Sequence, residues 1–482
     1  MKIVKKPKKA TGYSRRQFVK STALAAGGLM IVPRHVLGRG YVPPSDKVNL
    51  AFVGAGGRGA ALVNAMDSQN IVALCDVDEE RAKDTFKKHD KAKRYKDFRK
   101  MLEDQKDFDA VVVATPDHTH AVVALPAMEL GKHVYVEKPL THSIYEARQL
   151  TEMAARQKLV TQMGNHGASR EGVRVLMEIM DTGIIGEVHK VQAWTNRPIW
   201  PQGVPTPAGK HEVPATLDWN LWQGPAKARD YNPNYLPFKW RGWWDYGTGA
   251  LGDMGCHILD PVFRALKLKY PVAAEASVSQ VYVGDFHEAN YEDSCPPASK
   301  VHVYFPERPD GKGGKLPPVE VVWYDGGVMP PYPDELLPGE PMGNWDGGVI
   351  FEGTKGKIMC DCYGDNPRLL PSTTYRYFKS PEPTIPRIQE GHQMNWINGI
   401  KKGSPTTSAF DYAGPFTEMV LMGNLAVRCF NLKKLKPGAN PAGWAPYEYP
   451  GRLKLKWDGE NMRITNFEEA NQFVKREYRT GW

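Results

Sequence analysis

Short apolar runs alternate with helical patterns over the first third of the chain. Runs typical of buried parallel strands lie at residues 48–53, 71–76, 109–114, 133–137 and 160–163. Patterns with a helical period fall around residues 58–66, 79–90, 97–105, 118–130 and 143–157. This alternation predicts an α/β fold class, with a doubly wound parallel sheet over residues 46–165.

The pattern changes after Asn165. A helical pattern at 169–181 precedes strand-like runs near 187–196, 275–284, 299–305, 318–324 and 348–352. Long loops rich in Pro, Gly and Trp separate these runs, and helical patterns return at 389–402 and 411–432. We therefore expect an α+β second domain over 166–450 with a large, mainly antiparallel open sheet. Residues 451–482 are expected to form a tail that packs back on the body.

The N-terminus has the pattern of an export signal. Residues 14–20 read Ser-Arg-Arg-Gln-Phe-Val-Lys, and residues 21–32 form a weakly apolar run of small side chains. This run is too short to span a bilayer, so we expect no membrane span after processing. A generic basic terminus explains the charge but not the order of these residues. We expect residues 1–45 to be a twin-arginine signal and linker, recognised by the export machinery and directing the protein to the periplasm.

The charge of the chain is concentrated in this segment. The formal net charge is +9, but residues 1–45 hold ten Lys or Arg and no acid, which leaves 53 basic and 54 acidic residues in the remainder. A nearly neutral mature protein has no electrostatic footprint for nucleic acid. The six cysteines are scattered and lack a zinc-type arrangement, so we expect mostly free, buried thiols and no metal site.

A glycine-rich turn follows the first apolar run. Gly54, Gly56 and Gly59 have the Gly-x-Gly-x-x-Gly spacing of a dinucleotide site, and the second apolar run ends in Asp76. The turn and the helix N-terminus after it suit a pyrophosphate, which makes Gly57 and Arg58 cofactor-binding candidates as well. Asp76 would accept hydrogen bonds from a ribose and repel a 2′-phosphate, which favours NAD over NADP. A Rossmann-type NAD-binding domain is therefore expected.

Two further motifs carry candidate chemistry. Lys138, in Glu137-Lys138-Pro139, follows a predicted strand where it can bond a substrate oxygen, or it is a surface lysine. If Asp253 begins a helix, Asp253 and His257 share one face, and the pair suits general-base chemistry. The alternative is a capping aspartate with a packed histidine.

Seven of the thirteen tryptophans lie between Trp194 and Trp244. Because sugar rings stack on aromatic faces, this cluster suits a carbohydrate cleft. The same residues also suit a core or an oligomer interface, and both interpretations stay open at this point.

The Glu-Lys-Pro motif, the sheet pattern and Asp253-x-x-x-His257 behind a Gly-rich lead resemble the Gfo/Idh/MocA oxidoreductases. Residues 217–225 and 457–482 are similar to the exported bacterial branch of that family. The resemblance implies catalytic roles for Lys138, Asp253 and His257. It also implies further cofactor contacts at Thr115, Pro116, His118, His120, Glu137, Lys138 and Asn165, and substrate contacts at His166, Trp240 and Asp260.

This resemblance implies hydride transfer between a sugar and NAD, in a protein that is expected to form a homo-oligomer. An exported enzyme is expected to carry NAD tightly bound, because a free cofactor would be lost. Two alternatives remain. One is a glycosidase or lyase that oxidises the sugar transiently, and the other is a sugar-binding protein without turnover.

Overall fold

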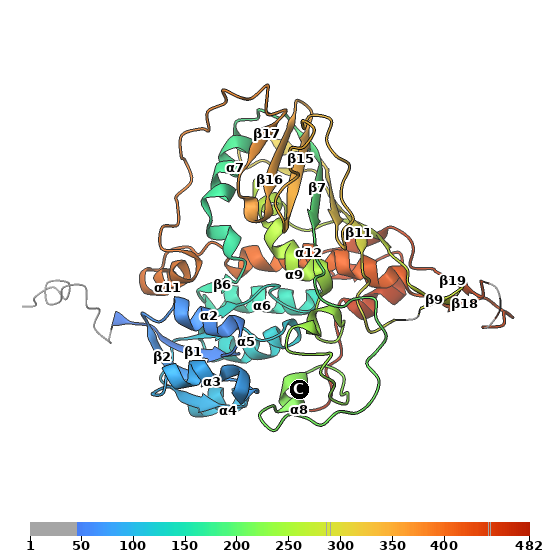
Figure 1. Ribbon diagram of the computed structural model, residues 1–482. Helices are drawn as coiled ribbons and strands as arrows, with labels where there is room; N and C mark the ends of the chain where they lie inside the picture. Colours follow the sequence, from blue (N-terminus) through green and yellow to red (C-terminus); the bar gives the residue numbers. More distant parts are fainter. Residues whose placement is uncertain (1–45, 286, 290, 442, 444) are drawn as a thin grey trace, which may run out of the picture. The chain divides into compact units, whose positions relative to one another are not determined.

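The computed structural model describes residues 46–482, with the exception of residues 286, 290, 442 and 444 (Figure 1). Every described helix and strand belongs to residues 48–482, which form one compact unit. The twin-arginine signal predicted over residues 1–45 lies outside the described residues and stays a prediction.

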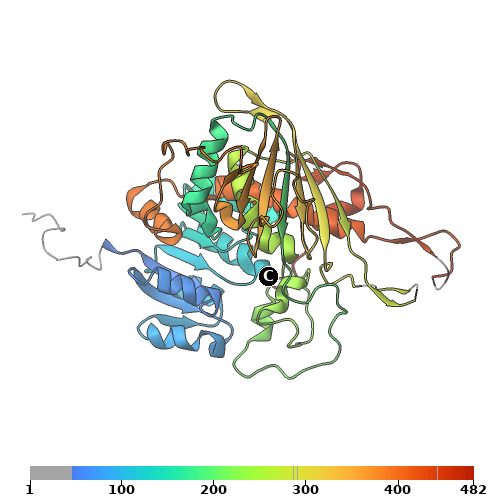
Figure 2. The same cartoon turned by 45° about the horizontal axis from the view of Figure 1, so that its top comes forward.

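Among the described residues, six parallel strands form the first sheet, in the order β3-β2-β1-β4-β5-β6. Figure 2 shows this sheet in blue and cyan. The strands are β1 (Asn49–Val53), β2 (Asn70–Cys75), β3 (Lys93–Tyr95), β4 (Ala110–Val113), β5 (His133–Val136) and β6 (Thr161–Met163). The predicted doubly wound sheet is confirmed. The sequence does not predict β3, because two of its three residues are exposed basic side chains.

Side chains alternate between the two faces of this sheet, and each face packs on its own helices. Phe52 belongs to one hydrophobic cluster with residues of α2 and α3, whereas Val53 belongs to another with residues of α4, α5 and α6. Trp396 of the distant helix α11 joins the Phe52 cluster. The helices are α2 (Arg58–Ala65), α3 (Glu79–Lys88), α4 (Phe98–Asp104), α5 (His120–Glu129), α6 (Ile144–Gln157) and α11 (His392–Lys402).

The second sheet has nine strands within the described ranges, in the order β17-β16-β15-β7-β14-β11-β8-β20-β21. Its neighbours pair antiparallel, apart from the parallel pair β7 and β14. The strands are β7 (Val188–Thr195), β8 (Ala273–Val278), β11 (Ser299–Phe305), β14 (Val319–Tyr324), β15 (Gly347–Gly353), β16 (Lys357–Asp361), β17 (Arg368–Leu370), β20 (Leu455–Asp458) and β21 (Arg463–Ile464). The mainly antiparallel second sheet is thus confirmed, and the tail contributes its last two strands.

Helix α12 lies between the two sheets and packs against α6 and against strands β8 and β11 (Figures 1 and 2). The helices of this part are α7 (Glu171–Asp181), α8 (Trp219–Gln223), α9 (Gly249–Ile258), α10 (Asp260–Ala265) and α12 (Phe410–Phe430). Helix α9 begins at Gly249 and not at Asp253, yet it contains both Asp253 and His257, which share one face. Asp253 lies in its middle turn.

Short elements complete the chain. The 3-10 helices are η3 (Asp117–Thr119), η4 (His166–Ser169), η5 (Lys239–Gly242), η6 (Cys362–Gly364) and η7 (Glu468–Phe473). The hairpin strands are β9 (Tyr282–Gly284) with β10 (His287–Glu288), β12 (Arg308–Pro309) with β13 (Lys315–Leu316), and β18 (Lys434–Leu435) with β19 (Tyr447–Glu448). All six cysteines are buried and free, as expected. Within the described part of the chain, no helix has both the length and the apolar character needed to cross a membrane.

The turn from β1 to α2 is packed too closely for side chains. A Cβ added to Gly59 would lie 1.7 Å from the backbone oxygen of Gly54. Gly54 itself has a φ of +85°, and a Cβ there would lie 2.7 Å from the oxygen of Ala114. The turn therefore keeps its shape only with glycine at these two positions.

We expect Gly59→Ala to lower the free energy of unfolding by about 3 kcal/mol, because the added methyl group meets backbone that has no room to move. Urea denaturation measures the change. The matched control is Gly284→Ala, at an exposed site where the nearest atom to the new Cβ lies 3.6 Å away. Equal midpoints for the two variants would contradict the close packing.

Candidate active site

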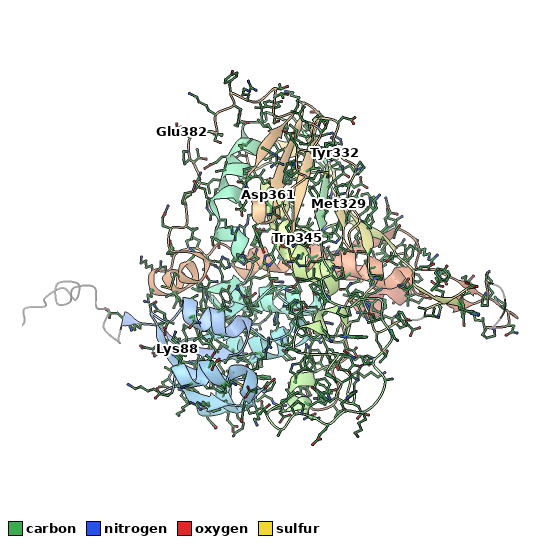
Figure 3. The ribbon with its side chains drawn as sticks, viewed as in Figure 1. Lys88, Met329, Tyr332, Trp345, Asp361 and Glu382 are labelled. Carbon is green, nitrogen blue, oxygen red and sulfur yellow. The ribbon has the colours of Figure 1, made fainter. Side chains whose placement is uncertain are left out.

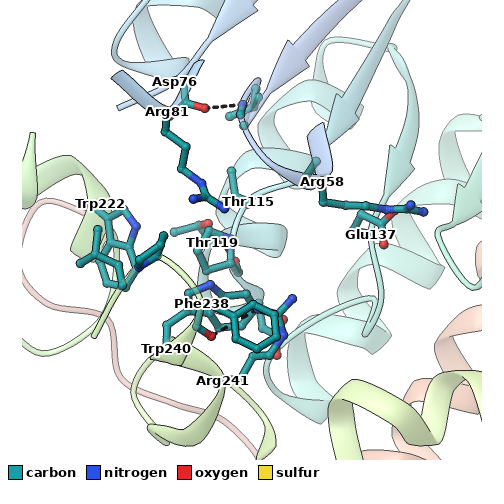
Figure 4. A pocket seen from close by; sticks show the side chains of 18 of the residues that line it. Arg58, Asp76, Arg81, Thr115, Thr119, Glu137, Trp222, Phe238, Trp240 and Arg241 are labelled. Carbon is teal, nitrogen blue, oxygen red and sulfur yellow. Dashed lines mark hydrogen bonds and ion pairs between the residues drawn. The ribbon is translucent and has the colours of Figure 1, made fainter. Parts of the chain in front are cut away.

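A cavity of about 500 Å³ opens at the carboxyl ends of β1, β2, β4 and β5 (Figure 4). In doubly wound sheets this is the edge at which ligands bind. Residues of η5, α9 and η6 form the facing wall. The predicted site residues that line the cavity are Gly54, Gly56, Arg58, Asp76, Thr115, Pro116, Glu137, Lys138, His166, Trp240, Asp253 and His257.

Asp76 organises one end of the cavity. Its Oδ2 atom accepts hydrogen bonds from the backbone N–H groups of Ala55 (2.8 Å) and Gly56 (2.9 Å), and this ties β2 to the glycine turn (Figure 4). Burial raises the pKa of Asp76, although these backbone donors oppose the shift. Arg81 extends over the same turn, and its guanidinium would lie 2.6 Å from a Cβ at Gly57. This end therefore offers both an acid and a cation to a ligand.

The N-terminus of α2 suits a dinucleotide. Its N-cap residue, Gly57, supplies no side-chain cap, and the first turn contains no acidic residue. Uncapped N–H groups and the helix dipole favour an anion at such a position. Arg58 of the first turn pairs with Glu137 at 2.8 Å (Figure 4). Together with the glycine turn and Asp76, these groups form the donor and acceptor set that phosphates and a ribose require.

Lys138 and Asp253 meet across the cavity. The Nζ atom of Lys138 donates to the Oδ1 atom (2.6 Å) and to the backbone oxygen (2.7 Å) of Asp253, and Arg241 donates to the same Oδ1 atom from 3.1 Å. Burial alone would raise the pKa of Asp253, but the charges of Lys138 and Arg241 outweigh it and hold the pKa well below its usual value. Three charges with a net charge of +1 therefore line this wall.

His257 lies beside this charged group in an aromatic cluster. The ring centroids of His166 and Tyr363 lie 5.1 Å and 4.9 Å from that of His257. Burial, and then the charge of Lys138, holds the pKa of His257 well below its usual value. Burial and the charge of Arg58 lower the pKa of His166 to about 4. Both rings are thus neutral at pH 7, and a neutral imidazole can accept a proton.

Aromatic side chains form the wall opposite the glycine turn. The Arg241 guanidinium lies 4.3 Å from the ring centroids of both Trp240 and Phe238 (Figure 4). The tryptophan cluster serves in a core and lines the cavity at once, because Trp222 and Trp240 line the cavity and also belong to the hydrophobic cluster of Trp219 and Trp243.

Two predicted cofactor residues, His118 and His120, do not face the cavity. The ring nitrogens of His118 lie 3.2 Å and 2.9 Å from the backbone oxygens of Tyr246 and Trp222. Burial lowers its pKa to about 3. His120 lies similarly between the oxygens of Pro139 (2.8 Å) and Thr115 (2.9 Å). Both rings join backbone segments, which corrects the expectation of cofactor contacts.

Asp260 and Asn165 also differ from their predicted roles. Asp260 is buried and accepts hydrogen bonds from Asn165 (2.8 Å), Arg264 (3.1 Å) and Tyr412 (2.7 Å). This carboxylate is therefore committed to an internal network and not to substrate. Neither residue lines the cavity, and Gly57 faces Arg81 instead.

Sequence reasoning missed several cavity residues, which are Arg81, Arg197, Phe238, Arg241, Tyr363 and Trp482. Arg81 follows Asp76 by five residues, and this proximity was a usable signal. Tyr363 carried no such signal. It lies in η6 with a φ of 67°, a left-handed conformation that is uncommon for a side chain of its size.

Two family models match the chain. One, described as "Oxidoreductase family, NAD-binding Rossmann fold", matches residues 48–165. The other, described as "Oxidoreductase family, C-terminal alpha/beta domain", matches residues 172–295. Together they cover half of the chain.

Curated relatives are similar over part of their length. A glycosyl hydrolase family 109 protein of Shewanella pealeana is 30% identical over 216 residues, which are 39% of this chain and 47% of that protein. An inositol 2-dehydrogenase/D-chiro-inositol 3-dehydrogenase of Lacticaseibacillus casei is 33% identical over 152 residues, which are 30% of this chain and 44% of that protein. The chain thus spans about half the length of the curated relatives it matches.

Solved structures share the fold. GenD2 from gentamicin A biosynthesis, solved with NAD, has a TM-score of 0.51 at 19% identity, covering 80% of this chain and 97% of that one. The WlbA dehydrogenase of Bordetella pertussis, solved with NADH and UDP-GlcNAcA, has a TM-score of 0.52 at 16% identity, covering 79% and 97%. These structures confirm the fold, and the family matches confirm the resemblance and the expected NAD cofactor. The chain belongs to the Gfo/Idh/MocA oxidoreductase family, and residues 48–165 are its NAD-binding Rossmann domain.

Proposed function

We propose that the protein is an NAD-dependent oxidoreductase acting on a hydroxyl group of a sugar or glycoside. The observation that carries the proposal is the Lys138–Asp253 ion pair beside the neutral His257, at the cavity of an NAD-binding domain. The aromatic wall at Trp240 supports a carbohydrate substrate, because sugar rings pack on aromatic faces. The sugar-related names of several relatives also support it.

The residues of the cavity divide the work. The glycine turn, Asp76 and Arg81 would hold the dinucleotide, whose nicotinamide supplies the hydride acceptor. His257 accepts the proton of the substrate hydroxyl, a contribution of about 10²–10⁴ in rate for a general base. The Lys138 ammonium has three N–H groups, and the described residues engage two of them, both at Asp253. The third can donate to the substrate oxygen as negative charge develops.

Export forms the second part of the proposal. We propose that the chain folds around NAD before it leaves through the twin-arginine route, and keeps that cofactor in the periplasm. A second sugar, or a later step of the same cycle, then returns the cofactor to its oxidised form. The twin-arginine pattern of residues 14–20 supports this location.

A redox-assisted glycosidase or lyase is the second candidate, favoured by the glycosyl hydrolase family 109 relatives. In that reaction a transient oxidation of the sugar would acidify the neighbouring C–H group and let the aglycone leave as an alcohol. Addition of water and return of the hydride to the sugar would then complete the cycle. The same base and lysine serve both reactions. Cleavage of the glycosidic bond without net formation of NADH would distinguish this candidate from the first.

A homo-oligomer is also part of the proposal. Large apolar side chains beside the second sheet are exposed, among them Met329, Tyr332 and Trp345, the last at 82% (Figure 3). Exposed apolar side chains of this size support association with a second copy.

The bound cofactor provides one test of this proposal. We expect the protein purified from its exported form to release stoichiometric NAD or NADH on denaturation, because a dissociable cofactor would be lost after export. Mass spectrometry of the released nucleotide tests this. An empty protein that binds added NAD only weakly would contradict the resident cofactor and favour the binding-protein interpretation.

Substitution of the base, His257, provides another test. We expect His257→Gln to slow the sugar half-reaction by about 10²–10⁴-fold, because the variant lacks a general base. Absorbance of reduced nicotinamide in single-turnover experiments measures the rate. The matched control is His211→Gln, at an exposed position, which should react like wild type. A normal rate with His257→Gln would remove this residue from the mechanism.

The pH dependence of the rate also tests the role of His257. Because burial lowers the pKa of His257 well below 6.5, the base stays deprotonated as the pH falls from 8 to 6.5. The half-reaction rate attributed to proton transfer should therefore decline only below pH 6.5. A decline centred above that value would assign the base to another group.

A further inference from the structure

The cavity has an end that the proposed chemistry does not use. It lies beside Asp76, where Phe98, Leu221, Trp222 and Trp482 line the wall. Backbone bonds from Asp76 to Tyr95 and from Asp218 to Val77 bring the starts of α4 and α8 to this end. In Rossmann domains the acid that follows the second strand contacts the adenosine ribose. The aromatic residues next to Asp76 are therefore at the adenosine end of the cavity.

Trp482 is held in place at this end by rings and cations. Its ring centroid lies 6.2 Å from that of Phe98, at an interplanar angle of 42°. The guanidinium groups of Arg99 and Arg479 lie 4.4 Å and 5.5 Å from the indole centroid. The indole therefore has a defined position from which it still lines the cavity.

Residues 474–482, the closing segment, are anchored to the Rossmann domain. Glu146, a buried residue of α6, binds the segment through its Oε1 atom, which accepts from Arg476 (2.8 Å) and from Tyr478 (2.6 Å). The Oε2 atom of Glu146 accepts from the N–H groups of His142 and Ser143 at the start of α6. Because the carboxylate is buried and fully used, this anchor is specific to the segment.

The same segment is anchored to the opposite wall. Arg479 donates to the backbone oxygens of Gly224 (2.6 Å) and Asn220 (2.6 Å), at and after helix α8. Helix α8 provides Trp222 to the cavity. The closing segment thus bridges the two walls of the adenosine end, and Figure 1 shows the end of the chain at α8.

We propose that Trp482 contacts the adenine of bound NAD and slows release of the cofactor. The chemistry is stacking of a planar base on an indole ring that Phe98 and two arginines hold in position. This rests on the proposed function, in which NAD stays bound through export. The closing segment would thus help to retain NAD, although it lies more than 300 residues from the glycine turn in the sequence.

The test compares Trp482→Ala, Trp482→Phe and wild type, each as the full chain freed of nucleotide. Calorimetric titration with NAD, ADP-ribose and nicotinamide mononucleotide separates the two halves of the cofactor. We expect Trp482→Ala to bind NAD and ADP-ribose about tenfold more weakly, as base stacking on an aromatic ring predicts, and Trp482→Phe to recover most of the loss. Nicotinamide mononucleotide should bind all three proteins equally, which also shows that they are folded.

A matched control is Tyr377→Ala, which removes an aromatic side chain that is 87% exposed and does not line the cavity. It should bind like wild type. Unchanged or tighter binding of ADP-ribose to Trp482→Ala would overturn the proposal, and tighter binding would show that the indole obstructs the cavity. Weak binding of NAD to wild type would contradict the proposal that NAD stays bound through export. The ratio of the dissociation constants of Trp482→Ala and wild type would still decide the role of Trp482.

Discussion

A partly buried group of three charges, Lys138, Arg241 and Asp253, determines how the two halves of the site meet. Lys138 follows β5 of the first sheet, whereas Asp253 belongs to α9, 115 residues later. Charges partly removed from water are costly unless they are paired and hydrogen bonded, so each of these two groups stabilises the other. Arg241 adds a second cation to the same carboxylate oxygen. These contacts therefore hold α9 against the carboxyl end of β5.

This constraint also sets the position of His257. Residues four apart on a helix share a face, so His257 lies one turn beyond Asp253 on the side that faces the cavity. His166 and Tyr363 then pack on its ring from η4 and η6. The base is thus positioned by packing and by the register of α9, since the Asp253 carboxylate bonds Lys138 and Arg241 instead of His257.

Sequence patterns predicted the features that depend on nearby residues and missed the contacts between residues far apart in the sequence. The glycine turn, Asp76 and the first sheet follow from short-range spacing, so these were predicted closely. His118 and Asp260 belong to motifs that the sequence assigns to the site. In the structure, backbone oxygens of Trp222 and Tyr246 bond His118, and the Asn165 side chain bonds Asp260, each from more than ninety positions away. Tyr363 and Trp482 reach the cavity from a 3-10 turn and from the tail. No periodicity in a single sequence indicates such contacts.

The low pKa of His257 raises the question of how a weak base can remove a proton from a sugar hydroxyl. The rate depends on the difference between the pKa values of base and hydroxyl, not on either alone. Lys138, whose charge helps to lower the pKa of His257, would also bond the substrate oxygen and lower the pKa of the hydroxyl. Because Lys138 would bond the substrate oxygen directly, the pKa of the hydroxyl should fall by more than the pKa of the imidazole. The positive wall can therefore favour proton transfer while it keeps His257 neutral and ready to accept.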